Sequence, residues 1–377
     1  MSVLQTVVSA VAALLVTAAL TAAVRRLALR VGAVDRPAAR KAHARPTPHL
    51  GGVSVLLATA GVLCAGHWTG MTEPGTAVMR LLAVSGAVAM LGLVDDLRPL
   101  GARLRLAFEA AAAAVVVSFA GLSFMAGVLA VVWIVFLTNA FNLLDNSDGA
   151  MGAVAVITAS GLLVCAAVDG RLGIVLLLAV LMASLGGFLI HNWHPAQIFL
   201  GDCGSLFTGF LLASAAVLVH AQAPDGRANW VSLPALTVVA LADTALVVVS
   251  RRRATRSVLL GGTDHIAHRL LRIRFTAPGA AVVLGLGASA GALVGTLVYA
   301  GQVPALTVLA LMVGAVAVIG RLLRIPVYGA PHSAADGVRT GTAPIVPQVV
   351  VGSGHTEAAM RARPVRRSAA GLAGDRK

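Results

Sequence analysis

Four polar side chains recur every three residues inside a strongly apolar part of the chain. They are Asn139, Asn142, Asp145 and Asp148, in the segment NAFNLLDNSDG (139–149). At the end of a helix, side chains three residues apart lie along one face. Amide and carboxylate oxygens gathered in this way suit Mg2+, which usually takes one or two protein carboxylates together with substrate phosphates. The spacing therefore predicts a site for a divalent cation and a phosphate.

A pair of adjacent carboxylates ends another apolar run, GLVDDLRPL (92–100). At the end of a helix, Asp95 and Asp96 would oppose each other and the helix dipole, so we expect a cation nearby. A structural cap made by Arg98, Arg103 and Arg105 explains this pattern as well as a functional site does.

Asp202 lies between glycines just before an apolar helix, in HPAQIFLGDCGS (194–205). Gly201 allows close approach of the backbone to a ligand, and free N–H groups at a helix start can bind phosphate. The G-x-G-D pattern of an intramembrane aspartyl protease is absent, because Leu200 stands two residues before Asp202.

Two histidines lie three residues apart in DHIAHRL (264–270). A zinc site of the common helical type would need a spacing of four and a glutamate. His265 and His268, followed by Arg269, suit a pyrophosphate instead. Asp243 is an ionisable group inside an expected spanning helix and is therefore a functional candidate. Glu109, one turn after Arg105, predicts an ion pair within one helix.

The elements that position these residues are apolar helices. The chain has 377 residues, of which 58% are hydrophobic and 12% charged, with a mean hydropathy of +0.89, which excludes an ordinary soluble domain. The composition predicts an all-α, polytopic integral membrane protein with about 11 transmembrane helices. The expected helices are near 3–24, 50–66, 76–94, 104–121, 123–138, 150–168, 172–190, 204–222, 231–250, 276–299 and 303–322. Gly287, Gly291 and Gly295 form a ridge of small residues suited to helix packing.

Basic residues predict the orientation, because cytoplasmic loops are enriched in Lys and Arg. With the N-terminus outside and the C-terminus cytoplasmic, 26 of the 29 Lys and Arg residues fall on the cytoplasmic side, in 25–49, 95–105, 251–274 and 321–377. The same side then holds every polar cluster described above. The net charge of +14 is explained by this topology and by contact with anionic lipid, so no nucleic-acid partner is expected.

Two parts of the chain differ in composition. We expect residues 1–324 to form a single transmembrane domain, whereas residues 325–377 change to Gly, Pro, Ser, Ala and Arg without periodicity. This second part predicts a disordered basic cytoplasmic tail.

Together the motifs resemble the polyprenyl-phosphate N-acetylhexosamine-1-phosphate transferase superfamily, or glycosyltransferase family 4. The likeness is to its bacterial undecaprenyl- and decaprenyl-phosphate GlcNAc-1-phosphate branch and, less closely, to the phospho-MurNAc-pentapeptide translocases. DRPAARKAHARPTPHLGG (35–52) is similar to the first cytoplasmic loop of that branch. The aspartate pair, the Asn-Asp segment, the Gly-Asp loop and the histidine motif follow in the family's order, so the resemblance covers about residues 34–274.

The resemblance implies a reaction at the cytoplasmic face of a bacterial cell membrane. A UDP-N-acetylhexosamine, with GlcNAc favoured, gives its sugar 1-phosphate to polyprenyl phosphate and releases UMP. This would be the first membrane step toward a lipopolysaccharide, a teichoic acid or arabinogalactan. It also implies Mg2+, with Mn2+ as a substitute, and is compatible with a homodimer.

The same resemblance assigns roles to residues. Those implied in catalysis are Asp95, Asp96, Asp145 and Asp148, with Asp95 orienting or deprotonating the acceptor phosphate. Those implied in metal binding are Asn142, Asp202 and Asp96. Those implied in substrate binding are His265, His268, Arg269, Asn139, Gly201, Lys41 and His43.

The sequence departs from the family pattern at three positions. Ala267 replaces a histidine of the H-x-H-H motif, and Asn146 and Ser147 replace Gly and an apolar residue. These departures leave open a catalytically altered homologue. A membrane transporter or flippase is a separate alternative from another class of protein. A transporter predicts charges near the bilayer centre and broken helices in two repeated halves, whereas the motifs here lie at helix ends.

Overall fold

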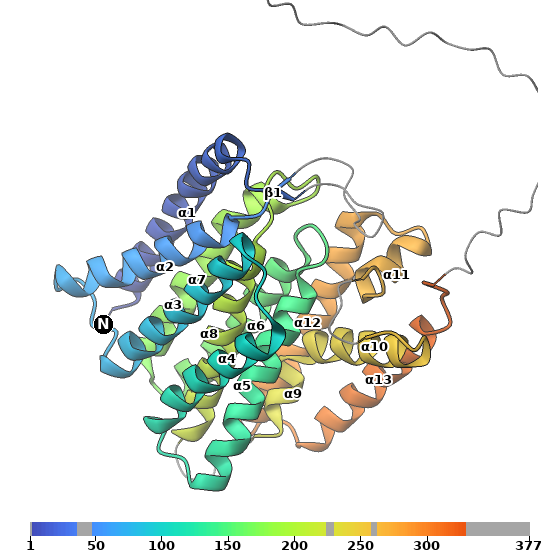
Figure 1. Ribbon diagram of the computed structural model, residues 1–377. Helices are drawn as coiled ribbons and strands as arrows, with labels where there is room; N and C mark the ends of the chain where they lie inside the picture. Colours follow the sequence, from blue (N-terminus) through green and yellow to red (C-terminus); the bar gives the residue numbers. More distant parts are fainter. Residues whose placement is uncertain (1, 36–46, 224–229, 258–261, 329–377) are drawn as a thin grey trace, which may run out of the picture. The chain divides into compact units, whose positions relative to one another are not determined.

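The computed structural model describes residues 2–35, 47–223, 230–257 and 262–328, and these residues fold mainly into helices (Figure 1). One pair of two-residue strands, β1 (Val34–Asp35) and β2 (Thr47–Pro48), runs antiparallel. The helices are α1 (Val3–Val31), α2 (Gly51–Trp68), α3 (Thr76–Leu97), α4 (Ala102–Ser118), α5 (Phe124–Leu144), α6 (Ala150–Val168), α7 (Leu172–Asn192), α8 (Gly201–Ala221), α9 (Ser232–Leu236), α10 (Val238–Arg253), α11 (Ile266–Arg272), α12 (Ala277–Tyr299) and α13 (Leu306–Leu322).

Every apolar stretch expected from the sequence lies in a helix. The stretch 231–250 is divided at Thr237 into α9 and α10. Within the described residues, eight helices are long and apolar enough to cross a membrane: α1, α2, α3, α5, α6, α7, α8 and α12. The all-α class with several such helices is therefore confirmed. The count of about eleven spans and the sides on which the termini lie stay predictions, because α4 and α13 have only 17 residues each.

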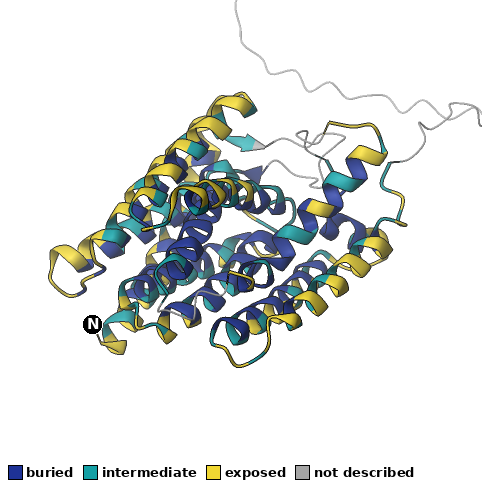
Figure 2. Ribbon diagram, turned by 90° about the horizontal axis from the view of Figure 1, so that it is seen from below, coloured by how far each residue is buried: buried dark blue, intermediate teal, exposed yellow. Residues whose placement is uncertain are grey.

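Helix α8 is the central element. Every residue of α8 from Cys203 to His220 is buried, and α2, α3, α5 and α6 all pack against it. The outer helices carry many exposed residues instead (Figure 2). Large apolar side chains among them include Val7 and Leu15 of α1 and Leu309 of α13. Such a surface is a liability in water but suits the hydrocarbon of a bilayer.

The start of α8 is held by close backbone contacts with two neighbouring helices. A Cβ added to Gly52 of α2 would lie 2.1 Å from the backbone nitrogen of Gly204. A Cβ added to Gly92 of α3 would lie 2.4 Å from the carbonyl oxygen of Asp202. Because glycine has no side chain, the first turn of α8 packs directly against the backbones of α2 and α3 at these two positions.

The helix ends that carry the polar clusters lie at one end of the bundle. The basic end of α1 lies there as well, because Arg25 donates to the carbonyl oxygen of Gln197 at 3.3 Å. At the other end, Arg171 before α7 donates to Gln222 after α8 at 2.5 Å. The aspartate pair, Asn142, Asp202 and the basic end of α1 thus share one end of the bundle, and that this end faces the cytoplasm stays a prediction.

The glycine ridge of α12 serves helix packing, as predicted. A Cβ on Gly291 would lie 2.4 Å from the carbonyl oxygen of Ala235 in α9. A Cβ on Gly295 would lie 2.7 Å from Cγ of Leu236. At these two positions α9 packs directly against α12.

The predicted division of the chain at residue 324 stays a prediction, but the residues just beyond it contact the helices. Residues 325–328 are bound by side chains of α11 and of the loop before it. The remainder of the predicted tail lies outside the described residues.

Candidate active site

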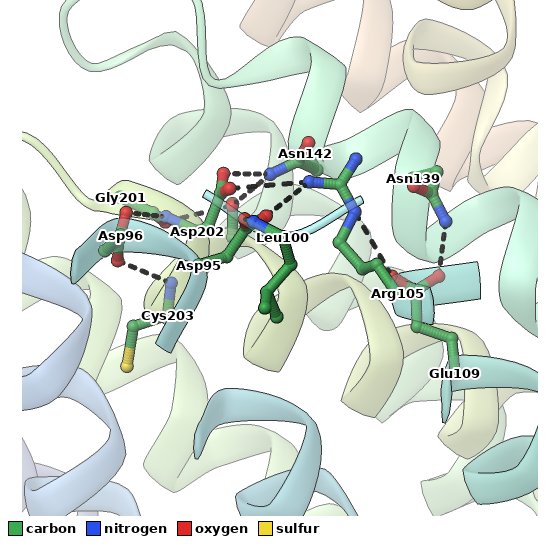
Figure 3. Close-up of polar contacts among 11 residues, drawn as sticks. Asp95, Asp96, Leu100, Arg105, Glu109, Asn139, Asn142, Gly201, Asp202 and Cys203 are labelled. Atoms are coloured by element: carbon green, nitrogen blue, oxygen red, sulfur yellow. Dashed lines mark hydrogen bonds and ion pairs between the residues drawn. The ribbon is translucent and has the colours of Figure 1, made fainter. Parts of the chain in front are cut away.

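Carboxylates from two helices meet around one arginine (Figure 3). Nη1 of Arg105, in the first turn of α4, donates to Oδ2 of Asp95 at 2.8 Å and lies 3.5 Å from Oδ2 of Asp202. Asp95 lies in the last turn of α3 and Asp202 in the first turn of α8. Arg105 thus supplies the compensating cation that the sequence led us to expect.

Asp96 faces the start of α8. Its Oδ1 accepts from the N–H of Asp202 at 2.9 Å, and its Oδ2 accepts from the N–H of Cys203 at 3.0 Å (Figure 3). A negative charge at a helix N-terminus is favourable because it meets the positive end of the dipole. The expectation that free N–H groups here bind a phosphate is wrong for these two groups, since the carboxylate of Asp96 already occupies them.

Asn142 joins α5 to the first turn of α8. Its Nδ2 donates to Oδ1 of Asp202 at 2.7 Å and to Oγ of Ser205 at 2.8 Å. Ser205 in turn donates to the carbonyl oxygen of Gly201 at 2.9 Å. The two residues predicted to bind a metal, Asn142 and Asp202, are therefore in direct contact.

Asn139, one turn earlier, points to a different partner. It donates to the fully buried carboxylate of Glu109 in α4 and to the carbonyl oxygen of Val135. Oε1 of Glu109 lies 3.9 Å from Nε of Arg105, which confirms the ion pair predicted within this helix. Asn139 is thereby linked to the aspartates through Glu109 and Arg105, and its contact with a substrate stays a prediction.

Asp145 lies beside the aspartate cluster, just beyond the end of α5. Burial, followed by the charges of Asp202 and Asp96, raises its pKa to about 7, although the backbone N–H of Gly201 opposes this shift. A carboxyl with this pKa is present in both its protonated and its ionised form near neutral pH.

Asp148 does not share the face of the preceding residues. Helix α5 ends at Leu144, so the three-residue spacing no longer places Asp148 on the helix. Its Oδ2 accepts from Nδ1 of His194 at 2.7 Å and from the N–H of Ala196 at 3.1 Å. The expectation of one common face is therefore wrong for Asp148, which lies instead with the loop after α7.

The histidine motif is held by α10. Nδ1 of His265 donates to Oδ2 of Asp243 at 2.7 Å, and Oδ1 of Asp243 accepts from the N–H of Ile266 at 2.7 Å. Asp243, the candidate in the expected spanning stretch 231–250, thus fixes the start of α11 from α10. Burial lowers the pKa of His268 to about 4, with a further contribution from His265, so His268 is neutral at pH 7.

Arg269 is buried, and its guanidinium is occupied by the protein. It donates to the carbonyl oxygens of Leu322 and Ile325, to Ser250 and to the carbonyl oxygen of Asp264. Its predicted contact with a substrate stays a prediction, and these bonds support a structural role. Lys41 and His43 lie outside the described residues.

The donor set fits a hard divalent cation. Carboxylate oxygens of Asp95 and Asp202 already lie around one positive charge, with the amide of Asn142 beside them. The described residues contain no group of three or more His, Cys, Asp or Glu arranged to hold a metal by itself. Mg2+ usually takes only one or two carboxylates and completes its shell with water and phosphate. The side chain of Asp202 is 33% exposed and that of Asp95 only 7%, so Asp202 is the more accessible of the two carboxylates.

Sequence reasoning missed two members of this site. Glu109 was assigned only to an ion pair, and Ser205 was not considered. The segment GDCGS gave a local signal for Ser205, which lies one turn after Gly201 on the same helix. No local signal links Glu109 to Asn139, because the two lie on different helices 30 residues apart.

Fold and site together define a polytopic helical membrane protein with an acidic site at the ends of its spanning helices. Residues 78–220 match the family model described as "Glycosyl transferase family 4". The matched range includes the aspartate pair, the Asn-Asp segment and Asp202, and ends before the histidine motif. The chain belongs to glycosyl transferase family 4, and the resemblance found from its motifs is confirmed.

Several bacterial relatives support this assignment. A Streptomyces coelicolor protein with a provisional glycosyltransferase name is 46% identical over 97% of this chain and 87% of its own length. The probable undecaprenyl-phosphate N-acetylglucosaminyl 1-phosphate transferase of Bacillus subtilis is 32% identical over 70% of this chain and 77% of its own length. The decaprenyl-phosphate N-acetylglucosaminephosphotransferase of Mycolicibacterium smegmatis is 33% identical over 69% of this chain and 74% of its own length.

Proposed function

We propose that this protein transfers an N-acetylhexosamine 1-phosphate, with GlcNAc-1-phosphate favoured, from a UDP-sugar to polyprenyl phosphate. The observation that carries the proposal is the meeting of Asp95, Asn142 and Asp202 around Arg105 at one end of the central helix. The names of the relatives from Bacillus subtilis and Mycolicibacterium smegmatis support the same chemistry.

The reaction is a phosphoryl transfer. An oxygen of the polyprenyl phosphate forms a bond to the phosphorus that carries the sugar. The bond from that phosphorus to the bridging oxygen of the pyrophosphate breaks, and UMP leaves with this oxygen. The products are polyprenyl-diphospho-sugar and UMP. Because anion attacks anion, catalysis depends mainly on charge neutralisation and on positioning.

Different side chains would bind the metal ion, orient the acceptor and balance the charge. Asp202 and Asn142 would hold Mg2+, with Asp96 fixing the backbone beside them. When bound, the ion would neutralise charge on the pyrophosphate. Asp95 would orient the acceptor phosphate, and Arg105 would balance the charge of the carboxylates. Asp145 would line the nucleotide and acceptor site.

The histidine segment and Asp148 complete the proposed site. His265 and His268 would bind the pyrophosphate or the sugar, and Asp148 would hold the loop after α7 through His194 and Ala196. A site at the ends of spanning helices suits one soluble and one lipid-dissolved substrate. The bacterial cytoplasmic membrane, with the site on its cytoplasmic face, is the proposed location, because the basic helix ends lie at the same end as the site.

Release of UMP by the purified full chain in detergent tests the function. We expect release that requires polyprenyl phosphate, stops when EDTA is added and returns with Mg2+ or Mn2+. Parallel reactions with UDP-GlcNAc, UDP-GalNAc and UDP-MurNAc-pentapeptide identify the sugar. No release with any of the three donors, from protein shown to be folded, would refute the proposal, and release without the lipid would replace it by a hydrolase.

Removal of residues 330–377 is expected to leave UMP release within about twofold of the full chain, because the compact unit ends at Gly329. The comparison uses equal amounts of the two proteins inserted in the same membranes. Lost activity in a correctly inserted truncated protein would show that the tail takes part in turnover.

A further inference from the structure

The segment Leu322–Tyr328, here called the C-terminal strap, is bound to α11 by two arginines. Arg269 and Arg272 both belong to α11, and both use their guanidinium groups on backbone carbonyls of the strap. The carbonyl oxygens that accept these bonds, at 2.6 to 3.0 Å, are those of Leu322, Ile325, Pro326 and Val327. The last carbonyls of a helix need such partners, and here the partners come from the histidine segment.

The far end of the strap is closed by a second set of bonds. The hydroxyl of Tyr328 donates to Oδ2 of Asp264 at 2.7 Å. Arg251 of α10 binds both oxygens of the same carboxylate at 2.9 Å, and the guanidinium of Arg256 lies 4.4 Å from the ring centre of Tyr328. Burial favours the neutral acid, but the bonds from Arg251 and Tyr328 outweigh it and hold the pKa of Asp264 below its usual range.

This carboxylate is directly connected to the histidine motif. Asp264 precedes His265 in the chain, and its carbonyl oxygen accepts from Nε of Arg269 at 3.1 Å. Asp243 holds His265 from the side of α10. The segment 264–269 is therefore fixed from two sides, by α10 and by the strap. Nδ1 of His268 is buried and has no hydrogen-bond partner among the described residues, so no hydrogen bond at this atom fixes the ring, which lies 5.9 Å from the ring of His265.

We propose that the C-terminal strap is a positioning element for the histidine segment, with Tyr328 and Arg272 as its positioning residues. Tyr328 acts through Asp264, and Arg272 acts through the carbonyls of the strap. The inference rests on the proposed function for the ligand of the histidines, which is the pyrophosphate or the sugar of the UDP-sugar. Arg269 then acts by holding the strap, since its donors are occupied by protein acceptors.

The variant Tyr328→Phe tests this role because it removes one hydroxyl and keeps the ring. A loosened histidine segment has to be ordered again on binding, so donor affinity falls. We expect the KM for the UDP-sugar to rise about tenfold, the cost of one hydrogen bond to a charged group. The KM for polyprenyl phosphate should stay unchanged. Amide hydrogen exchange of residues 265–272 in the full-length protein should become faster.

The other tyrosine of the chain is a matched control. The hydroxyl of Tyr299 donates to Asp169 and to the carbonyl oxygen of Val219, at the opposite end of the bundle. Tyr299→Phe should leave the KM for the UDP-sugar and the exchange of residues 265–272 at their wild-type values, even if it lowers Tm. A general loss of stability would affect both substrates and both variants alike.

A second pair of variants tests the strap carbonyls. Arg272→Ala removes two bonds to the strap, whereas Arg324→Ala removes an exposed charge that makes no side-chain bond in the described part of the chain. Arg272→Ala should raise the KM for the UDP-sugar, Arg272→Lys should restore part of the loss, and Arg324→Ala should change neither substrate.

The outcomes separate the strap from the proposed function. The proposed role of the strap is wrong if Tyr328→Phe and Arg272→Ala both keep the wild-type KM values and the wild-type amide hydrogen exchange of residues 265–272. Equal increases in the KM for both substrates would also overturn it. If the wild-type protein releases no UMP, the proposed function fails, and the role of the strap is then tested by amide hydrogen exchange alone. Faster exchange of residues 265–272 in Tyr328→Phe but not in Tyr299→Phe then supports the strap, and equal exchange rejects it.

Discussion

Asp202→Asn is expected to lower UMP release by about a hundred- to a thousandfold, the loss found when one electrostatic contact to a transition state is removed. The carboxylate of Asp202 bonds Asn142 and faces Arg105 at the start of α8. Asparagine keeps the size and the acceptor for Asn142 but removes the negative charge and the oxygen that faces Arg105. The first turn of α8 remains in place, because it is held through the backbone by Asp96 and by the contact with Gly92.

The measurement is UMP release over a range of Mg2+ concentrations, together with Mn2+ binding by electron paramagnetic resonance. Asp169→Asn is the matched control, because Asp169 lies at the opposite end of the bundle and bonds Tyr299. This control should keep its activity and its Mn2+ binding. Near-normal release by Asp202→Asn at ordinary Mg2+ concentration would reject the assignment of Asp202 to the metal.

Gly92→Ala is expected to lower activity about a hundredfold without altering any polar group, because small misplacements of reacting groups have effects of this size. The added Cβ would lie 2.4 Å from the carbonyl oxygen of Asp202 and 2.8 Å from Cα of Cys203. Both atoms are backbone atoms, so no side-chain rotation relieves the contact. The first turn of α8 has to move, and Asp202 moves with it.

The same helix offers the control for this variant. Gly86 has no atom within 4 Å of an added Cβ, and both positions lie inside α3. Gly86→Ala gains the same helix propensity, roughly 0.5–1 kcal/mol, so the difference between the variants isolates the contact. UMP release and Tm are measured for both proteins. Equal activities would show that α8 tolerates displacement at its start.

Sequence alone predicted the helices and the chemical character of the site, because both depend on local pattern. Apolar length is sufficient to find a spanning helix, and the segments around Asp95, Asn142 and Asp202 were each recognisable from neighbouring residues. The meeting of these three residues was implied only by a family resemblance. Their distances depend on how α3, α5 and α8 pack, which no single segment encodes.

The partners of individual side chains could not be predicted for the same reason. Asp96 binds backbone N–H groups about a hundred residues away, and Asn139 binds Glu109 of another helix. The three-residue spacing of the Asn-Asp segment predicts a common face only as far as the helix continues. Helix α5 ends at Leu144, so this prediction was wrong for Asp148. An arginine such as Arg269 is a common phosphate ligand, but in the fold its guanidinium donates to carbonyl oxygens of the protein.

The complete enclosure of α8 has a consequence for how the chain is made. This helix carries Asp202, Ser205, Thr208, Ser214 and His220, and polar groups facing lipid are costly. The helices that pack around it, α2, α3, α5 and α6, all precede it in the chain. Because synthesis proceeds from the N-terminus, these four helices are available before α8 leaves the ribosome. Helix α8 can therefore pass from the translocon into a partly assembled protein surface, and its first turn then brings Asp202 to Asn142 and Arg105, which are already in place.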